Sequence, residues 1–480
     1  MRPLAALAVV ALVLAPACGG SSGRGGGDAD TTSGDTALPV DVVTPADPVP
    51  ADWQLLYGYD SDGTTWDQEG LIGLAATSDG GVVALAERRF RTDPGARDLL
   101  MLSVGSDGAL ASAQRLRFDD EVTPVAFRRF ADGDLLLVFD RAELARVTSD
   151  GTVTWATSVD RDPYAFGGLE VTDVALADGG DVYLAGGFNP SEDGPDRTFV
   201  ARVGAADGAV AWMRSWPRDQ ETSFGARVAV SDAGVFVADL VQGANEIDRR
   251  VALVGLSLDG AALGSVAFTM TTTDGTLGAF REVALAPRTG GVTAVGLRAT
   301  AANGFAFHVY RLDLDASLAV TGQGVTLVTD VDSPFASDTR AAVGADGRLV
   351  AVMSRDSGAG WLFDWAPGSG VALAWQLGDA DGGPLFVDDA DLAPHVVLTA
   401  GGVVVGGTAD TPGAARLVPA AVGAESAPLD LLRDVVTVGA ETVVAEDATL
   451  GLTALDADDL GAQGEASDGD QDVLLFGVSP

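Results

Sequence analysis

Paired aspartates in short turns are the residues of this chain whose spacing could do chemistry. They occur as Asp60-Ser61-Asp62-Gly63, Asp379-Ala380-Asp381-Gly382 and Asp468-Gly469-Asp470. Carboxylate oxygens at alternate positions are the hard ligands that calcium prefers. None of these runs leads to the bidentate glutamate of an EF-hand loop, and a chain with 69 acidic residues contains such pairs by chance. We therefore expect no metal site and no bound cofactor.

Motifs for nucleophilic catalysis are missing from the sequence. It has one cysteine, Cys18, and two histidines, His308 and His395, too few for a histidine-based metal centre. It contains no Gly-x-Ser-x-Gly, no Gly-x-x-x-x-Gly-Lys-Ser/Thr and no His-Glu-x-x-His. We expect the protein not to be an enzyme. Because any two of its many acids could converge, a lyase or glycoside hydrolase that uses acidic residues is the alternative.

Aromatic, basic and acidic residues occur together in the long polar loops and are candidates for binding a partner. Aromatic and polar side chains together are typical of recognition surfaces. The candidates for binding a partner are Asp60, Asp62, Trp66, Asp160, Arg161, Tyr164, Trp216 and Arg218. The alternative is that the aromatic side chains only fill gaps in the fold. Loops that bind a partner need a rigid framework, which the rest of the chain has to provide.

That framework is a repeat of short apolar strands separated by tight turns. Residues 171–216 contain one unit of four strands, with turns at Asp178-Gly179-Gly180 and Asp207-Gly208. Two-residue hairpin turns need positive φ, which glycine supplies and aspartate tolerates. Turns between first and second strands are expected at 79–81, 132–133, 178–180, 232–234, 289–291, 346–347, 401–402 and 439–440, and between third and fourth strands at 107–108, 150–151, 207–208, 259–260, 315–316 and 368–370. Four-stranded units at this period, roughly 40 to 57 residues, predict an all-β chain folded as a β-propeller.

The two ends of the repeat region complete each other. Tryptophan recurs in fourth strands at Trp155, Trp212 and Trp375, and a lone copy stands at Trp53. Residues 472–478 have the pattern of a third strand with nothing after it. We therefore expect residues 52–58 to pair with 472–478 and to close the last blade, which leaves no exposed edge. The count is about eight four-stranded blades, with seven as the alternative, because residues 450–471 form either a long loop or an extra hairpin.

The N-terminus has the features of an export signal. Met1-Arg2 is followed by an apolar run, Leu4 to Leu14, that is too short to span a bilayer, so residues 1–17 are predicted to be a signal peptide. Residues 14–19, Leu-Ala-Pro-Ala-Cys-Gly, resemble the lipobox of bacterial lipoproteins. That resemblance implies cleavage before Cys18, lipidation of its sulfur and sorting to the outer membrane. The alternative is an ordinary signal peptide with an incidental cysteine. Residues 18–50, rich in Gly, Ser, Thr, Asp and Pro, are predicted to be a flexible tether.

The net charge excludes one class of partner. The formal charge is −40, and every basic residue is arginine. Such a chain repels nucleic acid and anionic membrane surfaces, so we expect no nucleic-acid partner. The simplest role of the charge is solvation.

Residues 53–58 and 77–83, Trp-Gln-Leu-Leu-Tyr-Gly and Thr-Ser-Asp-Gly-Gly-Val-Val, resemble the blades of bacterial propeller-repeat lipoproteins, which are similar to quinoprotein and kelch repeats. The resemblance covers nearly all of residues 51–480, predicted to be a single domain, and implies blades rather than a ligand. Short turns should lie on one face and the long candidate loops on the other. We expect a monomeric, outer-membrane-anchored binding or scaffold protein for a protein or glycan partner. A structural envelope protein without a discrete ligand is a further alternative.

Overall fold

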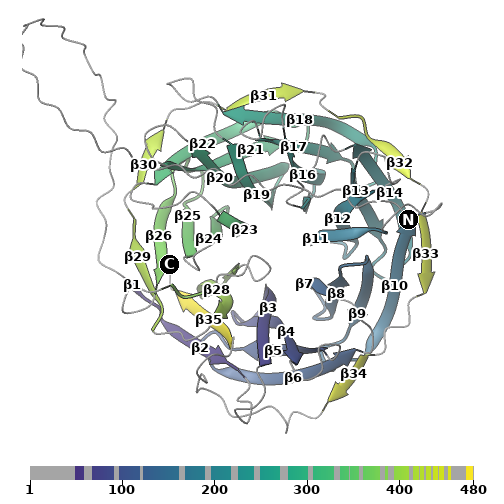
Figure 1. The fold of residues 1–480 in the computed structure, drawn as a ribbon, viewed down its shortest axis with the longest axis vertical. Helices are drawn as coiled ribbons and strands as arrows, with labels where there is room; N and C mark the ends of the chain where they lie inside the picture. The colour runs from purple at the N-terminus through teal and green to yellow at the C-terminus, as the bar shows by residue number, and fades with distance from the viewer. Residues whose placement is uncertain are drawn as a thin grey trace, which may run out of the picture. The chain divides into compact units, whose positions relative to one another are not determined.

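The computed structural model contains a ring of seven antiparallel β-sheets (Figure 1). It describes residues 49–58, 67–90, 97–118, 123–161, 168–189, 196–217, 225–242, 249–270, 279–300, 306–328, 336–344, 346–355, 360–378, 384–386, 394–409, 414–420, 422–425, 429–433, 436–441, 443–447, 452–455 and 472–478. All of them belong to one compact unit, residues 40–480. The fold is therefore a β-propeller of seven blades. The expectation of eight blades is wrong, and the alternative of seven is correct.

Six blades are built from four consecutive strands each, ordered from the axis outwards. Blade 1 holds β3 (Asp67–Ala76), β4 (Val82–Phe90), β5 (Arg97–Val104) and β6 (Leu110–Phe118). Blade 2 holds β7 (Pro124–Arg129), β8 (Leu135–Phe139), β9 (Glu143–Val147) and β10 (Val153–Arg161). Blade 3 holds β11 (Glu170–Leu176), β12 (Val182–Phe188), β13 (Arg197–Val203) and β14 (Val210–Pro217).

The next three blades follow the same plan. Blade 4 holds β15 (Arg227–Ser231), β16 (Gly234–Gln242), β17 (Arg249–Leu256) and β18 (Ala262–Met270). Blade 5 holds β19 (Ala279–Arg288), β20 (Gly291–Thr300), β21 (Ala306–Asp315) and β22 (Val320–Val328). Blade 6 holds β23 (Ala336–Val343), β24 (Leu349–Arg355), β25 (Gly360–Trp365) and β26 (Leu373–Gly378).

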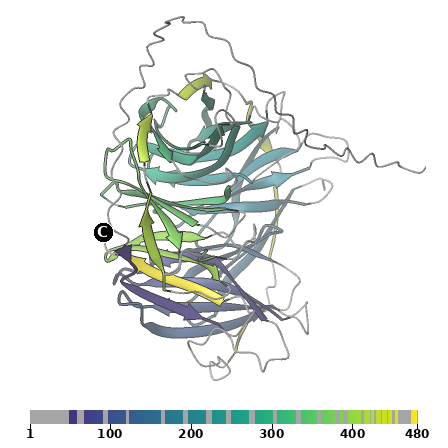
Figure 2. The same cartoon turned by 60° about the vertical axis from the view of Figure 1, so that its left-hand side comes forward.

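Blade 7 joins the two ends of the described chain. It holds β27 (His395–Thr399), β28 (Gly402–Ala409), β35 (Asp472–Val478) and β2 (Trp53–Tyr57), in that order. The pairing of β2 with β35 aligns Trp53 with Gly477 and Tyr57 with Val473. Figure 2 shows the yellow β35 lying beside the purple β2. The predicted closure by an N-terminal strand is confirmed.

An outer belt accounts for the residues that the sequence assigns to an eighth blade. The belt consists of β29 (Arg416–Pro419), β30 (Val422–Glu425), β31 (Leu429–Arg433), β32 (Gly439–Glu441), β33 (Val443–Asp447) and β34 (Leu452–Leu455). These strands pair in turn with the outermost strands of blades 6, 5, 4, 3, 2 and 1, so the belt runs backwards around the ring (Figure 1). The short β1 (Val49–Pro50) pairs with β29 in the same way. The turn expected at 439–440 is therefore wrong, because these residues lie within β32.

The belt covers strand edges that a propeller otherwise leaves open to pairing with other chains. Polar side chains fix it in place. Arg197 Nε donates to Ser215 Oγ at 2.9 Å, and this hydroxyl in turn donates to the carboxylate of Glu441 in β32. In blade 4 the Val436 N–H donates to Ser265 Oγ at 3.1 Å. The belt strands β29 to β34 thus pair with the outermost strands of six blades, and the next strand, β35, belongs to blade 7.

The hydrophobic core is divided among the junctions between blades. The described residues form seven buried clusters, one at each junction. The second strands are packed on both faces, and every residue of β8, β12 and β28 is buried. Continuous runs of Val, Leu and Ala suit this position, since both faces of the strand meet apolar neighbours. All expected turns other than the one at 439–440 join the predicted strands.

Candidate functional site

The structure describes few of the residues predicted to bind a partner. Cys18, Asp60, Asp62, Trp66, Tyr164 and Arg218 lie outside the described residues, as do the acidic runs 379–382 and 468–470. Asp160 and Arg161 end β10, where they pair with Val444 and Val443 of the belt. Trp216 is 2% exposed and packs in the cluster between blades 3 and 4. Its indole therefore belongs to the packing between blades, which is the alternative role of the aromatic candidates.

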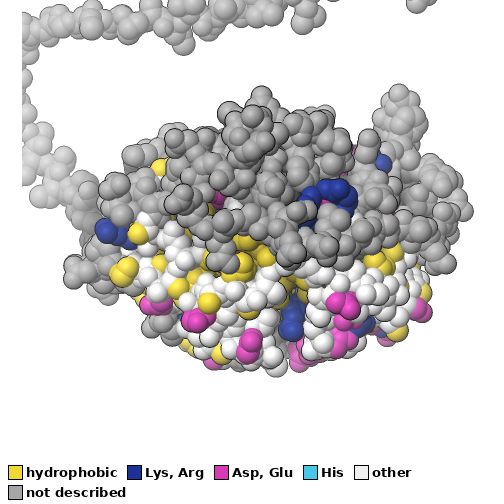
Figure 3. Space-filling model, turned by 90° about the horizontal axis from the view of Figure 1, so that it is seen from below, with side chains coloured by type: hydrophobic (Ala, Val, Ile, Leu, Met, Phe, Trp, Pro, Cys, Tyr) yellow, Lys and Arg dark blue, Asp and Glu magenta, His cyan; other side chains and the backbone are white. Residues whose placement is uncertain are grey.

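The described residues include the short turns of the opposite face, apart from residue 345. We call this the short-turn face. Its exposed carboxylates belong to Asp79, Asp107, Asp132, Asp150, Asp178, Asp207, Asp232, Asp259 and Asp346. Acidic side chains are spread along the described surface in Figure 3. A hydrogen bond from the Thr77 hydroxyl lowers the pKa of Asp79 below 3.8, and one from Thr148 does the same for the pKa of Asp150. Both carboxylates are therefore charged at neutral pH.

Arginines close to this face form ion pairs and hydrogen bonds within and between blades. In blade 2, Arg146 Nε donates to Asp134 at 2.8 Å, and Arg146 Nη1 donates to the carbonyl of Ala205 in blade 3 at 3.0 Å. The guanidinium lies 4.4 Å from the centre of the Phe130 ring. The indole of Trp155, directly opposite Arg146 on β10, donates to the same Ala205 carbonyl at 2.9 Å. One arginine and one tryptophan thus tie blade 2 to blade 3.

Blade 3 repeats this arrangement. Arg202 pairs with Asp181, and its Nη1 donates to the carbonyl of Leu258 in blade 4 at 3.2 Å. Trp212, opposite Arg202, donates to the same carbonyl at 3.2 Å. The indole ring lies against Gly260, where a Cβ would stand 2.9 Å from Trp212 Cδ2. The absence of a side chain at this turn glycine lets the tryptophan pack flat on the next blade.

The junction between blades 7 and 1 keeps the tryptophan, but glycine replaces the arginine. Trp53 packs on Gly108 of blade 1 as Trp212 packs on Gly260. The residue opposite Trp53 is Gly477, in the position that Arg146 and Arg202 hold in their blades. The Trp53 indole lies over this glycine, where a Cβ would stand 2.3 Å from Trp53 Nε1, and a small space remains beside the two residues.

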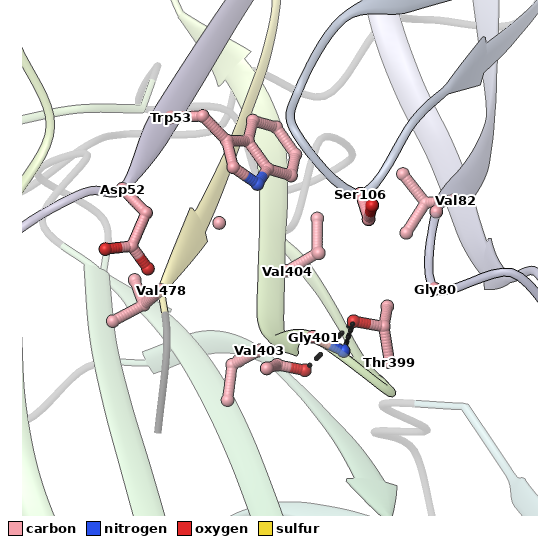
Figure 4. A pocket seen from close by; sticks show the side chains of 13 residues that line it. Asp52, Trp53, Gly80, Val82, Ser106, Thr399, Gly401, Val403, Val404 and Val478 are labelled. Atoms are coloured by element: carbon pink, nitrogen blue, oxygen red, sulfur yellow. Dashed lines mark hydrogen bonds between the residues drawn. The ribbon is translucent and has the colours of Figure 1, made fainter.

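That space is a cleft of about 70 Å³ on the short-turn face (Figure 4). Its lining comes from three parts of the ring: the outer side of blade 7 (Asp52, Trp53, Gly477 and Val478), the turns of blade 1 (Gly80, Gly81, Val82 and Ser106) and the β27–β28 hairpin (Thr399, Gly401, Gly402, Val403 and Val404). Figure 4 shows the indole nitrogen of Trp53 turned towards the space. Thr399 Oγ1 accepts from the Gly401 N–H at 3.2 Å and donates to the Gly402 carbonyl at 3.3 Å, so this hydroxyl is held by its own hairpin.

Charged groups near the axis hold neighbouring blades together. Arg128 of β7 donates to Asp173 of β11 at 3.0 Å, and Asp173 also accepts from the Val228 N–H of β15 at 2.9 Å. The chain Arg128–Asp173–Val228 thus links the inner strands of blades 2, 3 and 4. These groups satisfy each other, which suits a structural role.

Several carboxyls among the described residues have a pKa that is shifted by neighbouring groups. The carboxyls whose pKa is shifted among them, Asp79, Asp150 and Asp315, are all lowered, mainly by neighbouring hydroxyls. A general acid at neutral pH needs the opposite shift. The same part of the chain contains no group of three or more His, Cys, Asp or Glu side chains placed to hold a metal ion. Nor does it contain a helix long and apolar enough to cross a membrane.

Comparison with known proteins finds similar solved structures. No family model and no curated protein matches the chain. It is similar to BamB from Moraxella catarrhalis, with 10% identity and a TM-score of 0.35, over 73% of this chain and 85% of that chain. It is similar to the Dos1 propeller, with 9% identity and a TM-score of 0.37, over 76% of this chain and 95% of that chain. The assignment of the fold rests on the strand order of the chain itself.

The cleft is the site that sequence reasoning missed. The available signal is a comparison of blades: the residue opposite the fourth-strand tryptophan is Arg146 in blade 2, Arg202 in blade 3 and Gly477 in blade 7. Such a comparison requires the register of each pair, which the bulges in these strands shift by one residue.

Proposed function

We propose that this protein is a lipid-anchored scaffold of the bacterial cell envelope that binds a polypeptide partner through its acidic short-turn face. The observation that carries the proposal is the excess of exposed acidic side chains at this face. Even where a turn aspartate pairs with an arginine, as Asp132 does with Arg146 and Asp259 with Arg202, its side chain is 59% or 95% exposed. A surface of this kind attracts and orients a basic segment of a partner.

The architecture supports a binding role over a catalytic one. A ring whose last blade contains both ends of the described chain is a firm support for surface groups, since opening it means separating β2 from β35. The carboxylates on the face are exposed and held by local hydrogen bonds. Asp107 accepts from the Ala109 N–H and Asp207 from the Ala209 N–H, both at 3.0 Å. Exposed, ionised carboxylates suit the recognition of cations rather than proton transfer at neutral pH.

The anchor is expected to depend on one residue. Changing Cys18→Ala should move the protein from the membrane fraction to the soluble fraction, because the acidic body has no attraction for an anionic membrane surface. Fractionation of cells that produce each form, with detection of the protein in each fraction, measures the effect. The variant should unfold at the same temperature as the parent, since the change lies outside residues 51–480. A variant that stays in the membrane fraction would rule out the lipid anchor.

Neutralising the face is expected to weaken the capture of a partner. The triple change Asp107→Asn, Asp150→Asn and Asp207→Asn removes three charges and keeps the Oδ1 acceptor of each turn. Binding of a partner captured by the parent should fall by about tenfold at low salt, and the loss should shrink as salt rises. Affinity is measured with the anchored full-length protein and the captured partner. Equal affinity for parent and variant would show that the partner does not bind through the turn aspartates. Binding through the long-loop face, with a protein or a glycan as the ligand, would then be favoured.

A further inference from the structure

We infer that the cleft between blades 7 and 1 binds a main-chain carbonyl group of a partner polypeptide through the indole N–H of Trp53. That a polypeptide supplies the carbonyl rests on the proposed function. The open N–H does not, because it follows from a comparison of this junction with two others in the same ring.

The first step compares the indole N–H groups at three junctions where a fourth-strand tryptophan packs on a turn glycine. Trp155 donates to the Ala205 carbonyl at 2.9 Å, and Trp212 donates to the Leu258 carbonyl at 3.2 Å. Both acceptors are main-chain carbonyls in a short turn of the next blade. The indole nitrogen of Trp53 donates to no acceptor among the residues that the structure describes. One tryptophan of the three therefore keeps an open donor.

The second step is the reason why this N–H is turned away from the next blade. In blade 3, Arg202 stands opposite Trp212 and donates to the same Leu258 carbonyl. The residue opposite Trp53 is Gly477, and the nitrogen edge of the indole lies over this glycine. A side chain at position 477 would collide with that edge, so the orientation of the ring depends on glycine. The N–H consequently faces the cleft (Figure 4).

The third step is size. The cleft measures about 70 Å³. A single buried water needs roughly 10–15 Å³ on the same measure, so the space accommodates about five non-hydrogen atoms. The carbon, oxygen and nitrogen of one peptide group, together with the two α-carbons beside them, fill it.

The fourth step is the charge of the ligand. Besides the Trp53 N–H, the cleft offers the hydroxyl of Ser106, which is exposed on the side of blade 1. Asp79 and Asp107 are next to lining residues in the chain, and their exposed carboxylates repel an anion. A neutral oxygen acceptor therefore suits the donors of the cleft. A peptide carbonyl is a strong acceptor without charge, and it has two lone pairs.

The fifth step favours a polypeptide main chain as the source of that carbonyl. The acceptors at the two filled junctions are themselves main-chain carbonyls. Glycine also accounts for five of the lining residues, which lets another backbone approach closely. These glycines are Gly80, Gly81, Gly401, Gly402 and Gly477. A narrow lining without side chains suits an extended main chain better than the pyranose ring of a glycan.

The test follows the indole proton of Trp53 by nuclear magnetic resonance. The full-length protein in detergent carries tryptophan that is isotope-labelled on the indole nitrogen, and the variant Trp53→Phe assigns its signal among the 8 tryptophans. In the free protein the Trp53 proton should exchange with water faster than those of Trp155 and Trp212. The probe is N-acetyl-triglycine amide, which has carbonyl groups and no side chains. It should shift the Trp53 signal downfield saturably and leave the signals of Trp155 and Trp212 in place.

Two results of this titration would overturn the inference. The first is the absence of a saturable shift at Trp53, or an equal shift at Trp155 and Trp212, whose N–H groups already have acceptors. The second is an equal or larger shift with N-acetylglucosamine, since its amide carbonyl belongs to a sugar and would assign the cleft to a glycan.

Matched variants locate the effect. Ser106→Phe should fill the mouth of the cleft and abolish the shift. Ser149→Phe, at the same turn position in blade 2, should leave the shift intact and serves as the control for an added aromatic ring on this face. A shift that survives in Ser106→Phe would place the peptide elsewhere and refute the assignment.

The two proposals fail separately, because the probe carries no basic side chain. If Trp53 responds to the probe and no partner is captured, the carbonyl site stands and the scaffold role falls. If a partner is captured through the turn aspartates and the Trp53 signal ignores the probe, the scaffold role stands and the cleft assignment falls.

Discussion

Truncating the chain after Gln471 is expected to abolish cooperative folding of the propeller. The truncation removes β35, in which Val473, Leu474, Leu475 and Phe476 are fully buried. Complete burial of one such side chain contributes about 1.5–3 kcal/mol, so the loss of four amounts to about 6–12 kcal/mol. A folded domain is stable by only about 5–15 kcal/mol in total. Removal of this single strand is therefore expected to cost most or all of the free energy that stabilises the folded domain.

The loss is not confined to blade 7. Leu474 and Phe476 belong to the cluster between blades 6 and 7, and Val473 and Leu475 belong to the cluster between blades 7 and 1. In the described chain β2 pairs with β35 alone, so the N-terminal strand loses its place as well. One strand thus supports two junctions and the closure of the ring.

Denaturant unfolding followed by circular dichroism and tryptophan fluorescence measures the effect. The matched control deletes residues 49–58, which removes β1 and β2. Among the residues of β2 only Tyr57 is fully buried, so this deletion should lower stability by less and leave a cooperative transition. A truncated chain that unfolds cooperatively at the parent's denaturant concentration would show that β35 does not carry the closure.

The change Asp98→Asn is expected to destabilise the protein by about 3–5 kcal/mol. Asp98 lies in β5 and is 0% exposed. Its carboxylate accepts from Arg115 Nε, and from Arg117 Nε at 2.8 Å. Asparagine keeps the shape and removes the charge. The cost arises because the Arg115 guanidinium, which is itself largely buried, loses the anion that compensates its charge.

Two comparisons separate this effect from a general loss of charge. Asp132→Asn breaks an ion pair with Arg146 in which the aspartate side chain is 59% exposed, so it should cost less than about 1 kcal/mol. Replacing both buried partners, Asp98→Leu with Arg115→Met, should recover part of the stability, since no unpaired charge remains at either position. The free energy of unfolding from denaturant titration checks all three variants. Equal small losses for Asp98→Asn and Asp132→Asn would contradict the role of the buried pair.

Local rules explain why so much of the fold could be predicted from the sequence. A two-residue turn needs positive φ, and Gly108 and Gly208 adopt it at +81° and +71°. The apolar runs between such turns are long enough for one strand each. The closure of the ring also follows from pattern, because Trp53 repeats the motif of Trp155 and Trp212 at a place where no blade precedes it. Trp375 follows the pattern only in part: it lies in β26 as predicted, but it pairs with Leu362 and packs in the core between blades 6 and 7.

The number of blades could not be predicted with the same rules. The belt strands are short and apolar, like the strands of a blade, so the sequence offers no local sign that they pair with strands far away. Ala440 pairs with Arg214 and Val444 with Asp160. Whether a short apolar strand forms a new hairpin or extends an existing sheet depends on which open edges are nearby in space. The six outermost strands supplied those edges.

The sequence by itself determined the class of fold, the positions of the turns and the pairing of the two ends, because each of these follows from the conformational needs of a few neighbouring residues. The tertiary structure alone decided the seven-blade count, the outer belt and the cleft between blades 7 and 1. Asp52, Ser106, Thr399 and Gly477 are scattered along the chain and meet only when the ring closes.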